Sequence, residues 1–175
     1  LNNLSKKILN HKYLNEIKCY QFIEKDIYFP NIDNNHISEA TYYRLFLSNY
    51  IPNNLDYIVY LDGDVVCLND PIKKIREIND LIKDTNAIAV KTEHKRNDDT
   101  LKLFNTLEMK NDLYFNAGVM FINLSLWNEN KIENISQEKM RTMSNKLQFW
   151  DQDILNSIFD GDYVELREYM NHRIS

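Results

Sequence analysis

Short apolar runs recur at three places along the chain, each rich in strand-forming residues. The runs are Tyr57–Leu61, Asn86–Lys91 and Val119–Ile122. Because a continuous apolar run of this length is typical of a strand that is covered on both faces, each run predicts a buried strand. A fourth strand is predicted at Lys18–Ile23, ahead of a polar stretch.

Helices are predicted between and after these strands. Their ranges are Leu4–Leu14, Lys73–Lys83, Thr100–Met109, Gln137–Lys146 and Asp153–Phe159. Another helix is predicted to begin at Ser38, whose hydroxyl would cap the free backbone N–H groups, with Ile37 and Tyr42 as a hydrophobic staple. Pro52 ends that helix. The alternation of strands and helices indicates an α/β fold with a mostly parallel sheet and helices on either side.

The 175 residues fit one domain spanning 1–175, since no repeat, low-complexity tract or linker interrupts the pattern. The polar and charged stretch Glu93–Thr100 is expected to be a surface loop. With 43% hydrophobic and 27% charged residues, the composition is that of an ordinary soluble globular protein. The two cysteines, Cys19 and Cys67, exclude a disulfide scaffold and are expected to be free, partly buried thiols.

Several functional classes are disfavoured by composition. A net charge of −5 argues against nucleic-acid binding through a basic face. No apolar run approaches the roughly 20 residues that span a bilayer, and no basic and apolar leader opens the chain, so we expect a cytoplasmic protein without a transmembrane segment. With three glycines, the sequence holds neither a P-loop nor a G-x-G-x-x-G fingerprint.

An acidic pair follows directly on the predicted strand Tyr57–Leu61. Asp62 and Asp64 flank Gly63, and ligands of open α/β sheets bind beyond the carboxyl ends of the strands. Two carboxylates at this spacing on an extended chain project to the same side, and the glycine lets a ligand approach the backbone. Such oxygen ligands suit Mg²⁺ or Mn²⁺, with phosphate oxygens completing the coordination. A simple polar turn after the strand is the alternative.

The same segment permits a second chemistry. Haloacid-dehalogenase-like phosphatases carry a similar Asp-x-Asp motif after a hydrophobic strand, in which the first Asp is a nucleophile and the second an acid or base. Thr92 and the pair Gly161-Asp162 would imitate other parts of that site. A phosphatase therefore remains the alternative enzyme.

Four segments, in their order along the chain, resemble glycosyltransferase family 8. They are Thr41–Leu45, Tyr60–Asp64, Tyr114–Leu124 with Trp127, and Trp150–Asn156. The resemblance covers about residues 38–156, roughly two thirds of the chain. It implies a GT-A fold and a retaining transferase that uses a UDP-sugar and Mn²⁺, or Mg²⁺ in its place. The subgroup that it resembles consists of bacterial glucosyl- and galactosyltransferases of lipopolysaccharide or lipooligosaccharide synthesis. A UDP-hexose donor, a saccharide or lipooligosaccharide acceptor, no nucleic acid, and a place at the inner face of the membrane are therefore expected.

The resemblance also assigns roles on the nucleotide side of the site. Asp62 and Asp64 match the metal-binding pair, and Asp64 should also face the ribose or the sugar. Arg44 matches an arginine that contacts the donor sugar or its phosphate, a role that suits a permanently charged guanidinium with several donors. Without the resemblance, an arginine on a helix would be interpreted as solvated or salt-bridged.

On the sugar side, the resemblance points to two segments. Asn116, Ala117 and Gly118 match the loop that borders the sugar, where glycine permits close approach of the backbone. Asp151 and Gln152 match the pair beneath the transferred sugar and are the candidate catalytic residues. Asp151 would bind sugar hydroxyls, and Gln152 would lie near the anomeric carbon. Because an amide is a poor nucleophile, attack by the acceptor hydroxyl from the leaving-group face is favoured.

Simpler interpretations remain open for these segments. Residues 116–118 could form only a turn before a strand. Asp151 could be the N-cap of the helix that follows it. Trp127 and Trp150 are expected to pack in the core or at its rim and not to form sugar platforms.

The sequence departs from the family pattern at three places. The chain starts after the strand and loop that hold uracil and ribose. Thr92 or Glu93 stands where the family often has an Asp. The third metal ligand of the family is a histidine in a His-Phe-x-Gly-like segment, and no such segment surrounds His11, His36, His94 or His172. We therefore expect the central part of a longer enzyme, with a non-catalytic glycan- or partner-binding domain as the remaining alternative.

Overall fold

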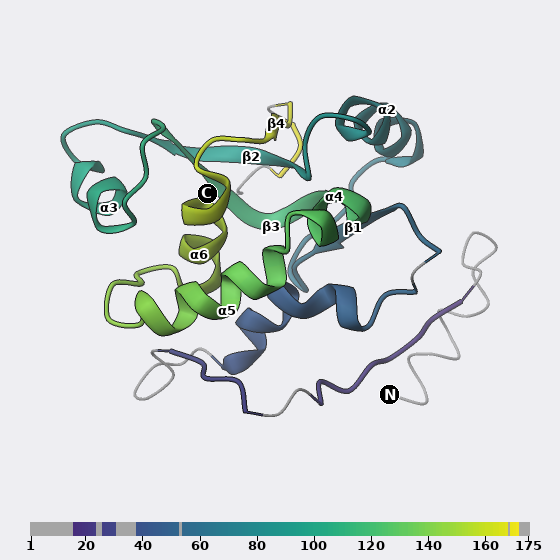
Figure 1. Ribbon diagram of the computed structural model, residues 1–175. Helices are drawn as coiled ribbons and strands as arrows, with labels where there is room; N and C mark the ends of the chain where they lie inside the picture. The colour runs from purple at the N-terminus through teal and green to yellow at the C-terminus, as the bar shows by residue number, and fades with distance from the viewer. Residues whose placement is uncertain (1–15, 24–25, 31–37, 53, 168, 172–175) are drawn as a thin grey trace.

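A four-stranded sheet lies in the middle of the computed structural model, which describes residues 16–23, 26–30, 38–52, 54–167 and 169–171. The strands are β1 (Tyr57–Leu61), β2 (Ile88–Lys95), β3 (Leu113–Asn123) and β4 (Val164–Glu165), in the order β1-β3-β2-β4. β3 pairs antiparallel with both β1 and β2, whereas β2 and β4 are parallel. Three strands therefore share one direction, and β3 runs the opposite way between β1 and β2 (Figure 1).

The predicted α/β fold is confirmed, but the sheet is mixed and not mostly parallel in its pairings, because the reversed strand β3 makes two of the three pairings antiparallel. An apolar run reports burial on both faces of a strand and carries no information on its direction. In β3, Met120 and Ile122 enter one core cluster, and Val119 and Phe121 enter another on the opposite face. β3 is thus covered on both faces even though it is antiparallel to its neighbours.

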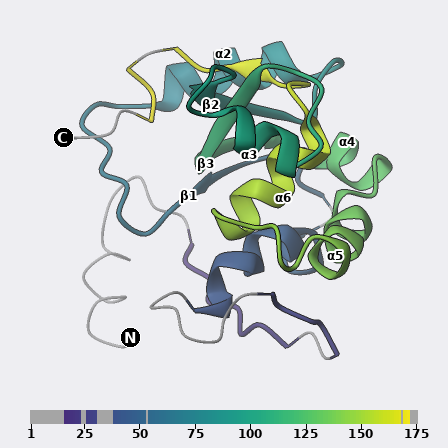
Figure 2. The same ribbon diagram turned by 90° about the vertical axis from the view of Figure 1, so that its left-hand side faces the viewer.

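Helices cover both faces of the sheet. They are the 3-10 helix η1 (Glu39–Asn49), α2 (Ile72–Ile82), α3 (Leu101–Thr106), α4 (Leu124–Glu129), α5 (Ile132–Thr142) and α6 (Trp150–Phe159). Figures 1 and 2 both show α2 on one side of the sheet and η1, α5 and α6 on the other. The larger core lies on the second side, with Trp127 fully buried in it and Trp150 at its rim, as expected. None of the described helices is both long and apolar enough to cross a bilayer.

Near the N-terminus the predicted strand and the predicted side-chain cap are wrong, although Ser38 does occupy the N-cap position of η1. Lys18–Ile23 forms no strand. The Ser38 side chain makes no capping hydrogen bond, and its backbone carbonyl instead accepts the Thr41 N–H at 3.2 Å. The predicted helix Leu4–Leu14 and the staple residue Ile37 lie outside the described residues.

Other boundaries shift because tertiary contacts override local pattern. The predicted loop at Glu93–Thr100 begins inside β2, which continues to Lys95. α5 begins at Ile132 and not at Gln137, and the short helix α4 precedes it. Cys19 and Cys67 are free, as expected, but both are exposed.

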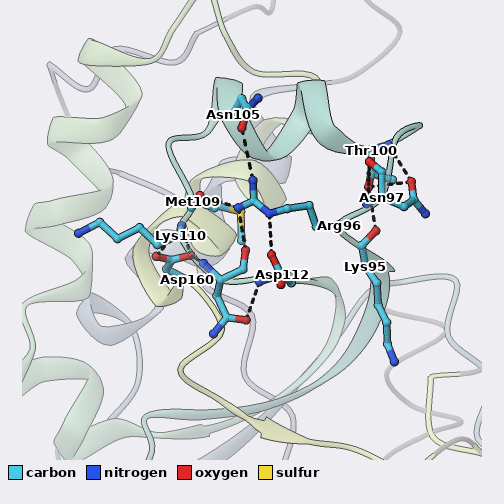
Figure 3. Close-up of polar contacts among 10 residues, drawn as sticks. Lys95, Arg96, Asn97, Thr100, Asn105, Met109, Lys110, Asp112 and Asp160 are labelled. Carbon is cyan, nitrogen blue, oxygen red and sulfur yellow. Dashed lines mark hydrogen bonds and ion pairs between the residues drawn. The ribbon is translucent and has the colours of Figure 1, made fainter.

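One arginine ties the connection between β2 and β3 together (Figure 3). Arg96 Nε lies 2.7 Å from Asp112 Oδ1, and Nη2 donates to the carbonyl oxygens of Met109 and Asn111 at 2.7 and 3.0 Å. The guanidinium also lies 4.8 Å from the centroid of the Phe104 ring. Because Arg96 follows β2 directly and its polar partners lie just before β3, Arg96 ties the two ends of the connection that carries α3 together.

The turn after α6 holds the same connection from its other side. Asp160 Oδ1 accepts the backbone N–H groups of Lys110 and Asn111, both at 2.9 Å (Figure 3). Asp160 and Gly161 both have left-handed backbone conformations, with φ of 42° and 84°. A Cβ on Gly161 would lie 2.3 Å from Asn111 Cγ. Glycine at this position therefore permits both the turn and its contact with the connection.

Replacing Gly161 should destabilise the fold. Gly161→Ala forces a side chain into a left-handed conformation and against Asn111, so we expect the free energy of unfolding to fall by about 1–3 kcal/mol. Urea-induced unfolding measures the loss. Gly63→Ala is the matched control, because a Cβ there meets nothing within 4 Å. Equal unfolding midpoints for the two variants would contradict the argument.

Candidate functional site

The candidate site lies at the carboxyl ends of β1 and β2, where the first half of β3 runs between them. The Asp62 N–H donates to the Gly118 carbonyl at 2.8 Å, which extends the β1–β3 pairing beyond Leu61. On the other side of β3, Asn116 pairs with Lys91 of β2. The sheet therefore places residues 116–118 beside Asp62. Side chains from η1 and α6 complete the site.

Arg44 makes hydrogen bonds and ion pairs with several segments of this site. Its side chain, which is only 9% exposed, extends from η1, and Nη1 donates to the Ala117 carbonyl at 2.7 Å. Nη2 lies 2.9 Å from Asp62 Oδ1, and Nε lies 2.8 Å from Asp151 Oδ2. The guanidinium carbon is 4.5 Å from the centroid of the Tyr60 ring. One buried cation thus joins all four segments that carry the resemblance.

The Asp62 carboxylate is held on one oxygen and free on the other. Oδ1 accepts the Tyr60 hydroxyl at 2.7 Å and pairs with Arg44, whereas Oδ2 has no hydrogen-bond partner in the described part of the chain. Burial and the Asp62 carboxylate raise the pKa of Tyr60, while the Arg44 charge opposes the shift. The Tyr60 phenol therefore stays a neutral donor. It binds Oδ1 of Asp62 and leaves Oδ2 available.

The acidic pair sits on a turn and not on extended chain. The Val65 N–H donates to the Asp62 carbonyl at 3.1 Å, so residues 62–65 turn back, and Asp64 is exposed. The expectation that Asp62 and Asp64 project to the same side from an extended chain is therefore wrong. Among the described residues, no group of three or more His, Cys, Asp or Glu side chains could hold a metal. Asp62 and Asp64 would therefore need further ligands to bind a cation.

Asn116 and Gly118 lie inside strand β3 and not in the expected loop, and close hydrogen bonds hold them. Asn116 Oδ1 accepts the Gly118 N–H and the Asn171 amide, both at 2.9 Å, and its Nδ2 donates to Glu93 Oε2 at 3.2 Å. A Cβ on Gly118 would lie 3.0 Å from Asn116 Oδ1 and 3.1 Å from Asp62 Oδ2. Side chains of the site itself therefore lie close to Gly118, whereas its close approach to a sugar stays a prediction.

Asp151 and Gln152 leave the first turn of α6 toward different partners. Asp151 is buried, and its Oδ1 accepts the Thr41 hydroxyl at 2.5 Å. Its Oδ2 lies at ion-pair distance from Arg44 without a hydrogen bond. Gln152 Oε1 accepts the Ala117 N–H at 2.9 Å. The alternative that Asp151 is the helix N-cap is wrong, because Phe149 occupies that position.

Sequence reasoning left one strand-end residue undecided, and the structure resolves it. Glu93 Oε2 accepts from the side-chain amides of Asn116 and Gln152, so Glu93 belongs to the site. Thr92 bonds to Glu165 and Tyr163 instead. For Glu93, the only local signal in the sequence was its position near the end of a predicted strand. Asn171, which also joins the site, had no local signal.

The phosphatase-like arrangement is not assembled. Asp162 accepts the Asn86 amide at 2.8 Å, and Asn86 precedes β2. Because β1 and β2 share one direction, this contact lies at the opposite end of the sheet from Asp62. Thr92 faces β4 through its bonds to Glu165. The structure therefore does not bring Thr92 or Asp162 close to the turn that carries Asp62 and Asp64.

The charge of Asp151 is controlled mainly by its burial. Burial raises the pKa of this carboxyl to about 6, and the Asp62 carboxylate adds to the shift. The Arg44 charge and the Thr41 hydrogen bond oppose it. Asp151 therefore titrates closer to neutral pH than an ordinary aspartate does.

Several known proteins are similar to this chain. The family model described as "Glycosyl transferase family 8" matches residues 1–175. A lipopolysaccharide 1,2-glucosyltransferase of Escherichia coli is 32% identical over 155 residues, which are 85% of this chain and 43% of that protein. A lipopolysaccharide 1,3-galactosyltransferase of Salmonella typhimurium is 31% identical over 67% of this chain and 35% of its own. This chain therefore spans less than half of either relative.

A solved structure is similar as well. The galactosyltransferase LgtC, crystallised in complex with donor and acceptor sugar analogs, superimposes with a TM-score of 0.61 and 30% sequence identity. The match covers 78% of this chain and 47% of that one. The predicted GT-A architecture is thereby confirmed for the matched part of the chain.

The raised pKa of Asp151 predicts that stability depends on pH. A group whose pKa is higher in the folded than in the unfolded state contributes stability at low pH that is lost as the pH rises through the folded value. We therefore expect the melting temperature to fall between about pH 4 and pH 7 through this residue. Thermal unfolding across this range measures the slope. Asp151→Asn should flatten it, and an unchanged slope in that variant would contradict the assignment.

Proposed function

Because the chain belongs to glycosyl transferase family 8, we propose that it carries the donor site of a retaining hexosyltransferase. The enzyme would move glucose or galactose from a UDP-sugar to a saccharide acceptor in lipopolysaccharide or lipooligosaccharide synthesis, at the inner face of the membrane. The relatives named above support the substrate class. The observation that carries the proposal is the convergence of Asp62, Ala117 and Asp151 on the buried Arg44 guanidinium.

Asp62 and Asp64 are the residues that would hold a divalent cation, Mn²⁺ or Mg²⁺. The free Oδ2 of Asp62 and the exposed Asp64 side chain supply hard oxygen donors, although only two of them. Phosphate oxygens of the donor and a further protein ligand would complete the coordination. When bound, the cation supplies charge stabilisation for the departing diphosphate. Arg44 and Tyr60 orient Asp62 for this task by occupying its other oxygen.

The sugar side of the site is suited to reaction without a covalent intermediate. Gln152 is a neutral amide whose oxygen is already bonded to the Ala117 N–H. It is therefore a poor nucleophile, in contrast to the second carboxylate of retaining glycosidases. In the proposed reaction, the bond between the anomeric carbon and the phosphate oxygen breaks. The acceptor oxygen bonds to the same face of the sugar, and its proton passes to the phosphate.

Loss of Asp62 should abolish turnover. In Asp62→Asn the turn and the Tyr60 contact can persist, but the negative charge that attracts the cation is gone. We expect Mn²⁺-dependent hydrolysis of UDP-glucose and UDP-galactose, measured as UDP release, to fall at least about a hundredfold. Asp98→Asn, an exposed change in the loop before α3, is the matched control and should keep full activity. Full activity of Asp62→Asn would refute the metal assignment.

Gly118 provides a second test of the same geometry. In Gly118→Ala, the new methyl group would press on Asn116 Oδ1 and Asp62 Oδ2 at about van der Waals contact or closer. We expect the rate of UDP-sugar hydrolysis to drop by roughly tenfold, since the two oxygens must shift by a fraction of an ångström and a misplacement of about 1 Å can cost about a hundredfold. The Mn²⁺ concentration for half-maximal rate should rise. An unchanged metal dependence would show that Gly118 does not act through Asp62.

A further inference from the structure

We propose that Tyr114 is a positioning residue that fixes the orientation of the Gln152 carboxamide, with the buried Asp153 as its anchor. The inference rests on the proposed function, because Gln152 is one of its candidate catalytic residues. A hydrogen-bonded chain runs from Asp153 through the Tyr114 hydroxyl to Gln152. Neither Tyr114 nor Asp153 was singled out by the sequence as a site residue.

The chain begins at a fully buried carboxylate. Asp153 Oδ2 accepts the backbone N–H groups of Gln148 and Phe149 at 2.6 and 2.7 Å, and Oδ1 accepts the Tyr114 hydroxyl at 2.7 Å. Burial raises the pKa of Asp153, and the three donors around its carboxyl group oppose this shift. The ionised carboxylate that these donors favour can only accept hydrogen bonds. The Tyr114 O–H must therefore point at Asp153.

This constraint determines what Tyr114 offers to Gln152. A phenol has one hydrogen, so once it points at Asp153 only lone pairs remain on the oxygen. The Tyr114 oxygen accordingly accepts from Gln152 Nε2 at 3.2 Å. The ring has no freedom to turn away, because it is fully buried and packs against Phe104, Phe149 and His94.

The other two neighbours of Gln152 require the same orientation. The Ala117 N–H needs an acceptor and meets Oε1, while the Glu93 carboxylate needs a donor and meets Nε2 at 3.1 Å. A flipped amide would place its oxygen against the Tyr114 oxygen and the Glu93 carboxylate, and its N–H groups against the Ala117 N–H. The carboxamide is therefore held in one orientation by groups on β2 and β3.

The test removes one oxygen atom and keeps the ring. In Tyr114→Phe, Gln152 loses the group that links it to Asp153, while the nucleotide side of the site is untouched. We expect kcat for Mn²⁺-dependent UDP-sugar hydrolysis to fall about ten- to a hundredfold with an unchanged KM for the donor. Tyr43→Phe is the matched control, because it also removes a hydroxyl bonded to a carboxylate, that of Glu39, and should keep kcat.

A double-mutant cycle separates positioning from general support of the fold. If Tyr114 acts through Gln152, Tyr114→Phe lowers kcat in the wild type but causes no further loss in a Gln152→Ala background. A purely structural role would lower kcat by the same factor in both backgrounds. That second result would overturn the proposal.

A measurement that does not depend on enzyme activity tests the positioning role separately from the proposed function. The side-chain NH₂ protons of Gln152, observed by NMR, should shift and exchange faster with solvent in Tyr114→Phe, and should not change in Tyr43→Phe. If the wild type hydrolyses neither UDP-glucose nor UDP-galactose, the proposed function fails and these signals alone decide the positioning role. Unchanged Gln152 signals in Tyr114→Phe would overturn it.

Discussion

The site depends on one buried positive charge. Removing a guanidinium from water costs on the order of several kcal/mol, and this cost is offset only when carboxylates and hydrogen bonds replace the solvent. Arg44 meets this condition only when the turn after β1, the start of α6 and the first half of β3 surround it together. Loss of any one of these segments would leave part of the guanidinium without a partner. The cation therefore specifies one arrangement of the four segments, whatever its net contribution to stability.

The reversed strand is what makes this arrangement possible. β3 runs between β1 and β2, so its first half passes the carboxyl ends of both neighbours. Residues 116–118 of β3 are thereby placed between Asp62 and Glu93, and Arg44 donates to the carbonyl of Ala117. Both faces of the second half of β3 are covered by core side chains, which keeps the strand rigid. The polar site is thus built on the continuation of a rigid buried element.

The sequence predicts those parts of this architecture that local pattern controls. The bounds of β1 are exact, and α2 and α6 lie within a few residues of their predicted ranges, because apolar runs and periodicity report burial directly. Hydrogen-bond partners are a different matter. Arg44 and Ala117 are 73 residues apart, and nothing near either one indicates the other. The family resemblance identified both residues but not that they bind each other.

The same limit explains the residues that were missed or misassigned. Asp151 looked like a cap because a cap is the common local role of an aspartate before a helix. Instead, α6 begins at Trp150, which has a left-handed conformation, and Phe149 is the N-cap. Tyr114 stood ahead of the predicted strand Val119–Ile122 and was given no role, since its hydroxyl has a purpose only beside Asp153. Polar groups in the interior are thus the features that sequence pattern predicts least well.

The charge balance of the site bears on what it is able to bind. Asp62, Asp64, Asp151 and Glu93 set four carboxyl groups against the single guanidinium of Arg44, and the nearby Lys91 is neutralised by Glu165. Burial reduces this excess by raising the pKa of Asp151, but it leaves the site negative. A diphosphate, which is itself anionic, would be repelled unless a cation accompanied it. A divalent ion beside Asp62 and Asp64 would remove the excess, so the electrostatics of these residues favour a metal-bound donor over a free one.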